Sequence, residues 1–204
     1  MWPVKARTVV WAAAVAGAAA AIGHAALRTE EGADVDRRLF RLINRGHGPG
    51  ADLLFFGVTE LGSLYASGAA AGALIVLGRR REAVRAIAAA GAAWVLGQAV
   101  KEVVDRRRPY EADADGTRRM IAEPMGTSWP SSHPAVLTAF TRVAARELGL
   151  GAPSRALLGG LDLAVAASRV YLGVHYPSDA ASGLLMGRAL AHLWPRGRRS
   201  EGSG

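Results

Sequence analysis

The stretch SRVYLGVHYPSD, residues 168–179, places an arginine, a histidine and an aspartate among apolar neighbours. Ionisable side chains in such surroundings are costly and tend to mark a functional site. Arg169, His175 and Asp179 supply an anion clamp, a nucleophile or base, and a carboxylate that can orient it, which are parts that phosphoryl transfer needs. The competing interpretation is a turn with a capping aspartate and a structural arginine–aspartate pair. We favour a functional site, because several polar groups share one short segment.

The spacing within this stretch predicts its local geometry. His175 and Asp179 lie four residues apart, and Pro177 is well suited to begin a helix. We expect Asp179 to hydrogen-bond one imidazole nitrogen of His175, which fixes the tautomer and leaves the other nitrogen free as a nucleophile. Arg169 lies near the end of the preceding apolar segment, where its guanidinium can make a forked contact with phosphate.

A second polar cluster, Pro130-Ser131-Ser132-His133, opens another apolar segment. Both serines are favourable N-cap residues, and Pro134 is favourable in the first helical turn. The free backbone N–H groups at a helix start form a phosphate site. His133 can donate a proton to a leaving oxygen there. A plain helix cap with an interfacial histidine is the alternative.

A third cluster consists of Lys101 and the pair Arg108-Pro109. Pro109 stops a helix, so we expect Lys101 and Arg108 to lie about two helical turns apart at the end of one helix. Both side chains can then reach one anion. The alternative is snorkelling of basic side chains at a helix end, and this cluster taken alone favours it.

Small apolar residues dominate the rest of the chain. Half of the 204 residues are hydrophobic, yet only 6% are aromatic. This composition suits close helix packing in a membrane, although a soluble alanine-rich bundle shares it. Six apolar segments lie at about residues 8–27, 53–77, 83–104, 134–150, 156–172 and 180–194. We therefore expect an all-α, six-helix membrane bundle as a single domain over residues 1–195, followed by a polar, disordered tail over 196–204.

A short amphipathic helix is expected after the first apolar segment, over residues 34–44. Asp34 is a suitable N-cap. The apolar residues that recur at helical spacing are Val35, Leu39, Leu42 and Ile43. This helix either lies in the membrane interface or serves as a plain surface connector.

Basic residues give the chain a net charge of +8 and fall in clusters between the apolar segments. They do not line one polar face, which argues against nucleic-acid binding. The positive-inside rule places most of these clusters in the cytoplasm, so the three polar clusters face the extracytoplasmic side of a multi-pass protein of the cell membrane. The first segment also fits a cleavable signal peptide, and cleavage would leave this orientation unchanged. The absence of cysteine excludes disulfides and thiolate metal sites.

The three polar clusters, in this order and with these internal spacings, resemble the three-part signature of the type 2 phosphatidic acid phosphatase (PAP2) superfamily. That superfamily includes lipid phosphatases and the vanadium haloperoxidases. The motifs span about residues 101–179, and the expected six-helix layout extends the resemblance over most of the chain. Glu60-Leu61-Gly62-Ser63 also resembles a segment common in bacterial members.

The resemblance implies a role for each matching residue. His175 would attack phosphorus and form a phosphohistidine, and Asp179 would orient it. His133 would protonate the leaving oxygen and then activate water. The phosphate would be bound by Lys101, Arg108, Ser131, Ser132 and Arg169. Neither a metal nor another cofactor is implied. Ser132 stands where the family usually has glycine, so its side chain can narrow the pocket or add a phosphate contact.

The function that follows is a membrane lipid phosphatase acting on a lipid phosphomonoester or pyrophosphate, by way of a phosphohistidine. Its partners would be the lipid phosphate and membrane lipids, and no nucleic acid. Polyprenyl diphosphate, polyprenyl-phosphoryl sugar phosphate, phosphatidic acid and phosphatidylglycerophosphate are candidate substrates, and location favours a polyprenyl carrier. The alternatives are a non-enzymatic lipid-phosphate binding or transport protein and a vanadate-dependent haloperoxidase. The sequence leaves the lipid chain and the oligomeric state open.

Overall fold

The computed structural model describes residues 6–196, and all regular structure in that range is α-helical. This confirms the expected all-α class. The tail predicted to be disordered lies outside the described residues, apart from Arg196. In chain order the helices of the described range are α1 (Ala6–Arg28), α2 (Glu30–Asn44), α3 (Pro49–Glu60), α4 (Leu64–Val76), α5 (Arg80–Val103), α6 (Pro109–Ala112), α7 (Ser132–Glu147), α8 (Ala152–Tyr171) and α9 (Pro177–Leu193).

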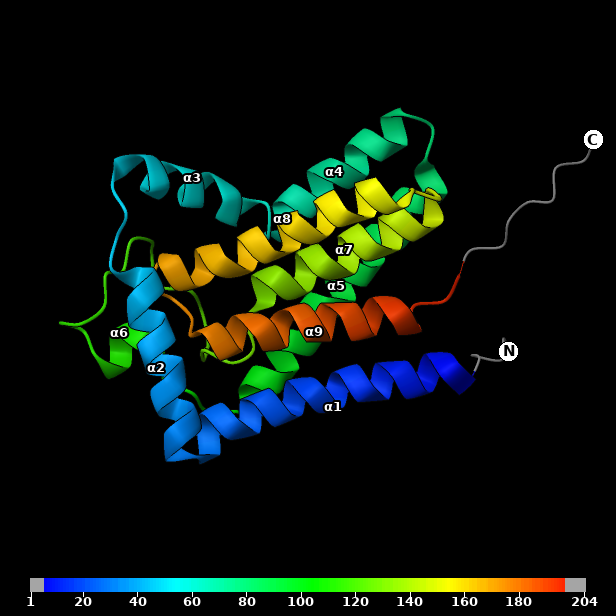
Figure 1. Cartoon of the computed structure of the whole chain (residues 1–204). Helices are drawn as coiled ribbons and strands as arrows, with labels where there is room; N and C mark the ends of the chain where they lie inside the picture. Colours follow the sequence, from blue (N-terminus) through cyan, green and yellow to red (C-terminus); the bar gives the residue numbers. More distant parts are fainter. Residues whose placement is uncertain (1–5, 197–204) are drawn as a thin grey trace, which may run out of the picture.

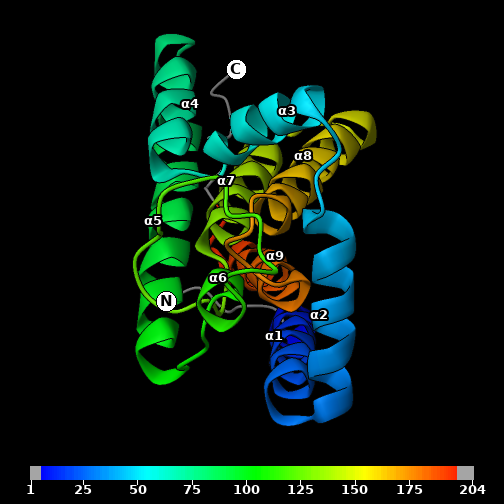
Figure 2. The same cartoon turned by 90° about the vertical axis from the view of Figure 1, so that its left-hand side faces the viewer.

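Helix α7 lies at the centre of the bundle and packs against α5, α8 and α9. Helix α1 covers α9 on the outside, and α4 packs on α5. Figure 1 shows α1, α7, α8 and α9 running alongside one another, with α2 turned across one end near α6. Figure 2 shows the same end from the front, where α6 lies before the ends of α7 and α9. The segments at this end carry the three polar clusters.

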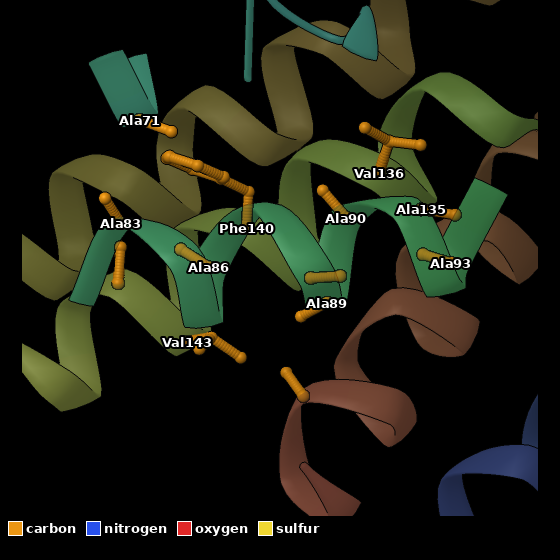
Figure 3. Close-up of a cluster of buried hydrophobic side chains, with 13 residues drawn as sticks. Ala71, Ala83, Ala86, Ala89, Ala90, Ala93, Ala135, Val136, Phe140 and Val143 are labelled. Carbon is orange, nitrogen blue, oxygen red and sulfur yellow. The ribbon is translucent and has the colours of Figure 1, made fainter. Parts of the chain in front are cut away.

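The packing of α5 on α7 relies on alanine. Five alanines of α5 are buried with essentially no exposed surface, and they face the central helix (Figure 3). From α7 the cluster receives Ala135, Val136 and Val143, while Phe140 fills the space toward Ala71 of α4. Alanine side chains let the two helix backbones approach closely, which is the packing that the composition predicted.

Helices α7 and α9 approach even more closely at two glycines, Gly183 and Gly187. A Cβ at Gly183 would lie 2.2 Å from the carbonyl oxygen of Ser131, and one at Gly187 would lie 2.4 Å from that of Ala135. No side chain fits at either place. The two glycines therefore let the N-terminal parts of α7 and α9 pack closely together. Two of the polar clusters lie at these N-terminal ends.

The second apolar segment was predicted as one continuous span, and this prediction is wrong. It is divided into α3 and α4, whose axes differ by 65° at the break after Glu60. Ser63 begins α4 by accepting a hydrogen bond from the Ala66 amide at 3.0 Å. A Cβ at Gly62 would lie 2.8 Å from Cβ of His133 and 2.7 Å from Cγ1 of Val165. The break thus brings the backbone directly against the second polar cluster.

The structure does not confirm the expected number of six membrane-spanning helices. Within the described residues, α5 is long and apolar enough to cross a membrane, and the bent pair α3–α4 passes the same test if it counts as one span. Charged residues interrupt several of the other helices, as in α7, which contains Arg142 and Arg146.

The expected amphipathic helix exists but begins earlier. Helix α2 starts at Glu30, and Thr29 caps it by accepting a hydrogen bond from the Gly32 amide at 3.0 Å, so Asp34 is not its N-cap. The side chains buried against the bundle are Asp36, Phe40 and Asn44. Three of the four predicted apolar positions, Val35, Leu39 and Leu42, lie on the opposite face and are exposed. This leaves an apolar stripe on the outer face of α2.

Candidate active site

The three polar clusters meet at one end of the bundle. Lys101 lies in the last turn of α5, His133 in the first turn of α7, and Arg169 in the last turn of α8, while His175 lies in the connection to α9. The His133 ring interacts electrostatically with Lys101, Arg108, Arg169 and His175. The structure therefore gathers residues that are up to seventy-four positions apart in sequence, as the clusters predicted.

His175 is almost fully buried, with 2% of its surface exposed. Its Nε2 lies 3.3 Å from Nη1 of Arg108, on the side of the other cations. Burial lowers the pKa of His175 to about 3, although the nearby Asp179 carboxylate acts to raise it. The imidazole is therefore neutral near neutral pH, which is the form that can act as a nucleophile.

The predicted hydrogen bond between His175 and Asp179 is not formed in this structure. His175 Nδ1 and Asp179 Oδ2 are 3.6 Å apart, beyond hydrogen-bond length, and Nδ1 has no other partner in the described part of the chain. The two groups face each other nonetheless. In unliganded sites such contacts are often long and shorten when substrate binds.

Asp179 is held by groups that the sequence did not single out. Its carboxylate accepts hydrogen bonds from Arg106 Nη1 at 2.5 Å, from the Ser128 hydroxyl at 2.6 Å and from the Tyr176 amide at 2.8 Å. The Asp179 side chain has no exposed surface. Its orientation is therefore fixed before any substrate arrives.

Arg106 extends this network to the amphipathic helix. Its Nη2 donates to Asp36 Oδ2 at 2.6 Å, and its guanidinium stacks 4.3 Å above the centre of the Tyr176 ring. Asp36 also accepts from the Ser178 hydroxyl and amide, at 2.5 and 2.9 Å. Burial alone would lower the pKa of Arg106, but the Asp179 and Asp36 carboxylates raise it above its ordinary value. One buried cation thus joins α2 to the start of α9.

The only signal for Arg106 in the sequence is its position, two residues before Arg108 in the run Arg106-Arg107-Arg108. Asp36 offers a second hint, because it is an acidic residue on the buried face of α2. Neither signal identifies the partner. The pairing of residues 36, 106 and 179 depends on how three distant segments fold together.

Arg108 lies beside His175. The prediction that Arg108 and Lys101 lie at the end of one helix is wrong. Helix α5 ends at Val103, and residues 104–108 form an irregular connection, so Lys101 and Arg108 are not on one helix. The guanidinium is fully buried. Its remaining donors reach backbone carbonyl oxygens at 2.9–3.2 Å, those of Met125, Gly126, Thr127 and Val174. Arg108 therefore ties the preceding loop to the His175 segment.

Arg169 and Ser131 offer unused hydrogen-bonding groups to this site. Arg169 is 3% exposed, and its Nη1 donates to Thr59 Oγ1 at 2.9 Å, while its Nε has no partner within residues 6–196. The Ser131 hydroxyl is also buried without a partner there, although Ser131 is the N-cap position of α7. Buried polar groups are normally satisfied, so these atoms point to a ligand.

Lys101 and Ser132 complete the set of predicted phosphate contacts. Lys101 is 9% exposed and interacts electrostatically with Arg108, Arg169 and Asp179. Ser132 Oγ accepts a hydrogen bond from Gln98 Nε2 at 3.3 Å, so its hydroxyl is partly engaged by α5. A metal would need a group of at least three histidine, cysteine or acidic side chains, and no such group occurs in the described range.

An apolar cavity of about 430 Å³ has Pro130, the residue before Ser131, in its wall. It lies between α1, α5 and α9, and Trp129 and Pro130, which precede the Ser131 cluster, form one wall. Trp129 is fixed by a hydrogen bond from its Nε1 to Ser182 Oγ at 3.0 Å. Small and aliphatic side chains of the three helices line the rest, among them Ala20, Leu96 and Met186.

Comparison with known proteins identifies relatives of this chain. Residues 82–202 match the model of the PAP2 superfamily. A decaprenylphosphoryl-5-phosphoribose phosphatase of Mycobacterium tuberculosis is 36% identical over 122 residues, which are 60% of this chain and 64% of that protein. The chain thus aligns with less than two thirds of the length of this curated relative.

Two solved structures share the fold. The crystal structure of Aquifex aeolicus LpxE superimposes with a TM-score of 0.67 and 27% identity, over 76% of this chain and 90% of the other. That of the first transmembrane PAP2 type phosphatidylglycerolphosphate phosphatase from Bacillus subtilis gives a TM-score of 0.68 and 21% identity, over 92% of each chain.

Proposed function

This chain belongs to the PAP2 superfamily, and on that premise we propose that it is a membrane lipid phosphatase that releases phosphate through a phosphohistidine. One observation carries the proposal: two histidines and three basic side chains share one buried site, in which Ser131 Oγ and Arg169 Nε lack partners in the described range. A phosphate group would supply acceptors for the donors and offset the gathered positive charge.

The proposed reaction has two steps that balance. His175 Nε2 attacks phosphorus, the bond from phosphorus to the lipid oxygen breaks, and His133 gives its proton to that oxygen. His133 then takes a proton from water, the hydroxide attacks phosphorus, and the phosphorus–nitrogen bond breaks to release inorganic phosphate. Asp179 faces Nδ1 and stabilises the proton there while Nε2 is bonded to phosphorus.

The cations have separate tasks in this proposal. Lys101 and Arg169 bind the oxygens of the phosphate and offset the charge that develops in the transition state. Arg108 reaches His175 at 3.3 Å and also binds four backbone carbonyls, so it positions the nucleophile segment as well as contributing charge. Ser131 adds a hydroxyl contact, and the amide of Ser132 adds one from the helix start.

The proposed substrate is a polyprenyl-linked phosphate. The Mycobacterium tuberculosis relative is named for a decaprenylphosphoryl substrate, which supports this class. The apolar cavity beside Trp129 would take the first part of the hydrocarbon chain while the phosphate lies near His133. Small-ligand sites typically have volumes of about 300–1,000 Å³, and this cavity falls within that range.

We expect the purified protein to release phosphate from lipid phosphates, in the presence of a metal chelator, with a higher kcat/KM than from p-nitrophenyl phosphate. The Ala20→Trp variant fills the apolar cavity and should lower kcat/KM for a long-chain substrate by about tenfold, a loss of roughly 1.4 kcal/mol. Its kcat/KM for p-nitrophenyl phosphate should not change.

Ala18→Trp is the matched control, because Ala18 is exposed on the opposite side of α1 and does not line the cavity. It should behave like the wild type on both substrates. An equal loss for the long-chain and the soluble substrate in Ala20→Trp would contradict the assignment of the cavity to the lipid chain. No phosphate release from any lipid phosphate would contradict the enzymatic function itself.

The proposed location is the cell membrane, with the site on the extracytoplasmic side. Large apolar side chains are exposed around the bundle, including Leu53 at 76%, Val76 at 87% and Leu157 at 76%, and lipid would cover them. The arginines at the other end, such as Arg80 and Arg155, support a cytoplasmic position for that end.

Labelling with an impermeant thiol reagent in intact cells tests this orientation. Asp115 is exposed in the loop beside α6, at the end of the site, and Ser154 is exposed at the opposite end of α8. Because the chain has no cysteine of its own, each variant has a single target. We expect Asp115→Cys to react in intact cells and Ser154→Cys to react only after permeabilisation. The reverse pattern would place the site in the cytoplasm.

A further inference from the structure

The turn between α3 and α4, residues 59–63, contacts two groups of the proposed active site but has no part in the proposed reaction. We call it the α3–α4 elbow. Its backbone is fixed by hydrogen bonds at 3.0–3.2 Å, in which the amides of Leu61, Gly62 and Ser63 donate to the carbonyl oxygens of Val58, Thr59 and Glu60. The elbow lies before residue 82, where the match to the PAP2 model begins, so that match assigns it no role.

Thr59 contacts Arg169 from the first end of the elbow. It lies in the last turn of α3, and α3 packs on α8 (Figure 2). The threonine is 1% exposed, and its Oγ1 accepts a hydrogen bond from Nη1 of Arg169 at 2.9 Å. Glu60, the next residue, also attracts Arg169 electrostatically. Thr59 thus holds one nitrogen of the guanidinium, while Nε, which has no partner among residues 6–196, remains available to a phosphate oxygen.

This contact prepares Arg169 for phosphate binding. A long arginine side chain loses much rotational freedom when its guanidinium is held in one place. Because Thr59 is buried and belongs to a helix, that loss occurs when the protein folds and not when phosphate binds. Such preorganisation increases affinity without any additional contact to the ligand.

Gly62 contacts His133 from the other end of the elbow. A Cβ at Gly62 would lie 2.8 Å from Cβ and 3.1 Å from Cδ2 of His133, and 2.7 Å from Cγ1 of Val165. These distances are shorter than the usual carbon–carbon contact of about 3.5–4.0 Å. Glycine therefore lets the elbow fit between α7 and α8, directly against the His133 ring. At Gly57, earlier in α3, a Cβ would meet nothing within 4 Å, so the constraint is local to the elbow.

We propose that the α3–α4 elbow is a positioning element of the active site. Thr59 holds Arg169 for the phosphate, and Gly62 keeps the His133 ring in place for proton transfer. This inference rests on the roles that the proposed function gives to Arg169 and His133. Thr59 and Gly62 act through those two side chains and do not need to touch the substrate. Functional side chains must be held to within about 0.5 Å of the productive geometry, which supporting contacts of this kind provide.

The Thr59→Val and Thr59→Ser variants test the first contact. Valine has nearly the shape of threonine but no hydroxyl, whereas serine keeps the hydroxyl. We expect Thr59→Val to weaken the binding of inorganic phosphate about tenfold, measured by equilibrium dialysis in detergent, and to raise KM for a lipid phosphate by a similar factor. Thr59→Ser should retain most of the wild-type affinity. Equal phosphate affinities in the two variants would overturn the role of Thr59.

A double-mutant cycle separates positioning from a general loss of structure. In the Arg169→Met background, Thr59→Val should have little further effect on phosphate affinity or on kcat/KM, because the guanidinium that Thr59 holds is gone. A loss of the same size in both backgrounds would contradict the proposal. Phosphate binding is measured without turnover. A wild type that hydrolyses no lipid phosphate would therefore contradict the proposed function and leave this comparison of affinities intact.

Gly62→Ala tests the second contact, with Gly57→Ala as its matched control. Alanine at position 62 displaces the His133 ring, so we expect kcat to fall by about 10–100-fold while the affinity for inorganic phosphate stays near the wild-type value. Gly57→Ala should have the wild-type kcat. Equal kcat values for the two variants, or a loss of phosphate affinity as large as the loss of kcat, would overturn the role of Gly62. If Gly62→Ala does not fold, the Thr59 variants alone decide whether the elbow positions the site.

Discussion

The His175→Asn variant is expected to release phosphate from a lipid phosphate about four to six orders of magnitude more slowly than the wild type, as in other enzymes that lose a nucleophile. His175 is neutral and buried, and its Nε2 faces the gathered cations. Asparagine is polar and smaller, so it fits the space but cannot form a stable bond to phosphorus. Single-turnover release of inorganic phosphate measures the effect.

His47→Asn is the matched control for that variant. His47 is exposed in the loop between α2 and α3, and its ring stacks on Tyr171 outside the proposed site. Its rate should stay within about twofold of the wild type, since exposed substitutions usually have small effects. A rate for His175→Asn close to that of the control would contradict the assignment of the nucleophile.

The same variant separates an enzyme from a lipid-phosphate binding protein. In the proposed function, binding uses Lys101 and Arg169 and does not require a nucleophilic His175. We therefore expect His175→Asn to retain its affinity for a lipid phosphate within about tenfold while turnover is lost. If the wild type binds the lipid phosphate as tightly as His175→Asn does but does not hydrolyse it, the binding function is favoured.

The Arg106→Met variant is expected to lower the free energy of unfolding by about 3–5 kcal/mol, because it leaves two buried carboxylates without their cation. Arg106 is the hydrogen-bonded partner of both Asp36 and Asp179. For a chain of this length the loss corresponds to a fall in Tm of roughly 6–20 °C. Activity measured below that Tm should also fall, by about 10–100-fold, because Asp179 is no longer held toward His175.

Arg107→Met is the matched control, since Arg107 is the neighbouring arginine and is exposed. Its stability should change by less than about 0.5 kcal/mol. Arg106→Lys keeps the charge but loses the fork that reaches two carboxylates, so its Tm should lie between those of the wild type and Arg106→Met. Equal Tm values for Arg106→Met and Arg107→Met would show that the network does not hold α2 and α9 together.

The proximity of the residues within each polar cluster could be predicted from the sequence because each cluster is short. His175 and Asp179 are four positions apart and Ser131 and His133 are two positions apart, so their proximity follows from local geometry. The expected six-span layout also predicts their convergence, since alternating spans place successive connections on the two sides of a membrane. The fold class followed from the same apolar segments.

The contacts that hold the site could not be predicted in this way. Arg106 is 70 residues from Asp36 and 73 from Asp179, and no periodicity links such positions. The bend between α3 and α4 was missed although Gly62 and the N-cap residue Ser63 mark the break, because the close approach of Gly62 to His133 and Val165 joins segments that are distant in sequence. The sequence predicts the apolar stripe of α2 that faces outward. It does not predict that the opposite face of α2 packs on the bundle through Phe40.

The most direct test of the proposed mechanism is to locate the phosphoryl group on the protein. A lipid phosphate with radiolabelled phosphorus is mixed with the wild type or His133→Asn, the reaction is quenched under denaturing alkaline conditions, and the tryptic peptides are separated. The peptide of residues 170–188 contains His175 as its only histidine. We predict that this peptide carries the label, with more label in His133→Asn, because breakdown of the intermediate needs His133. Label on the peptide of residues 120–142, or label that persists in His175→Asn, would contradict His175 as the nucleophile.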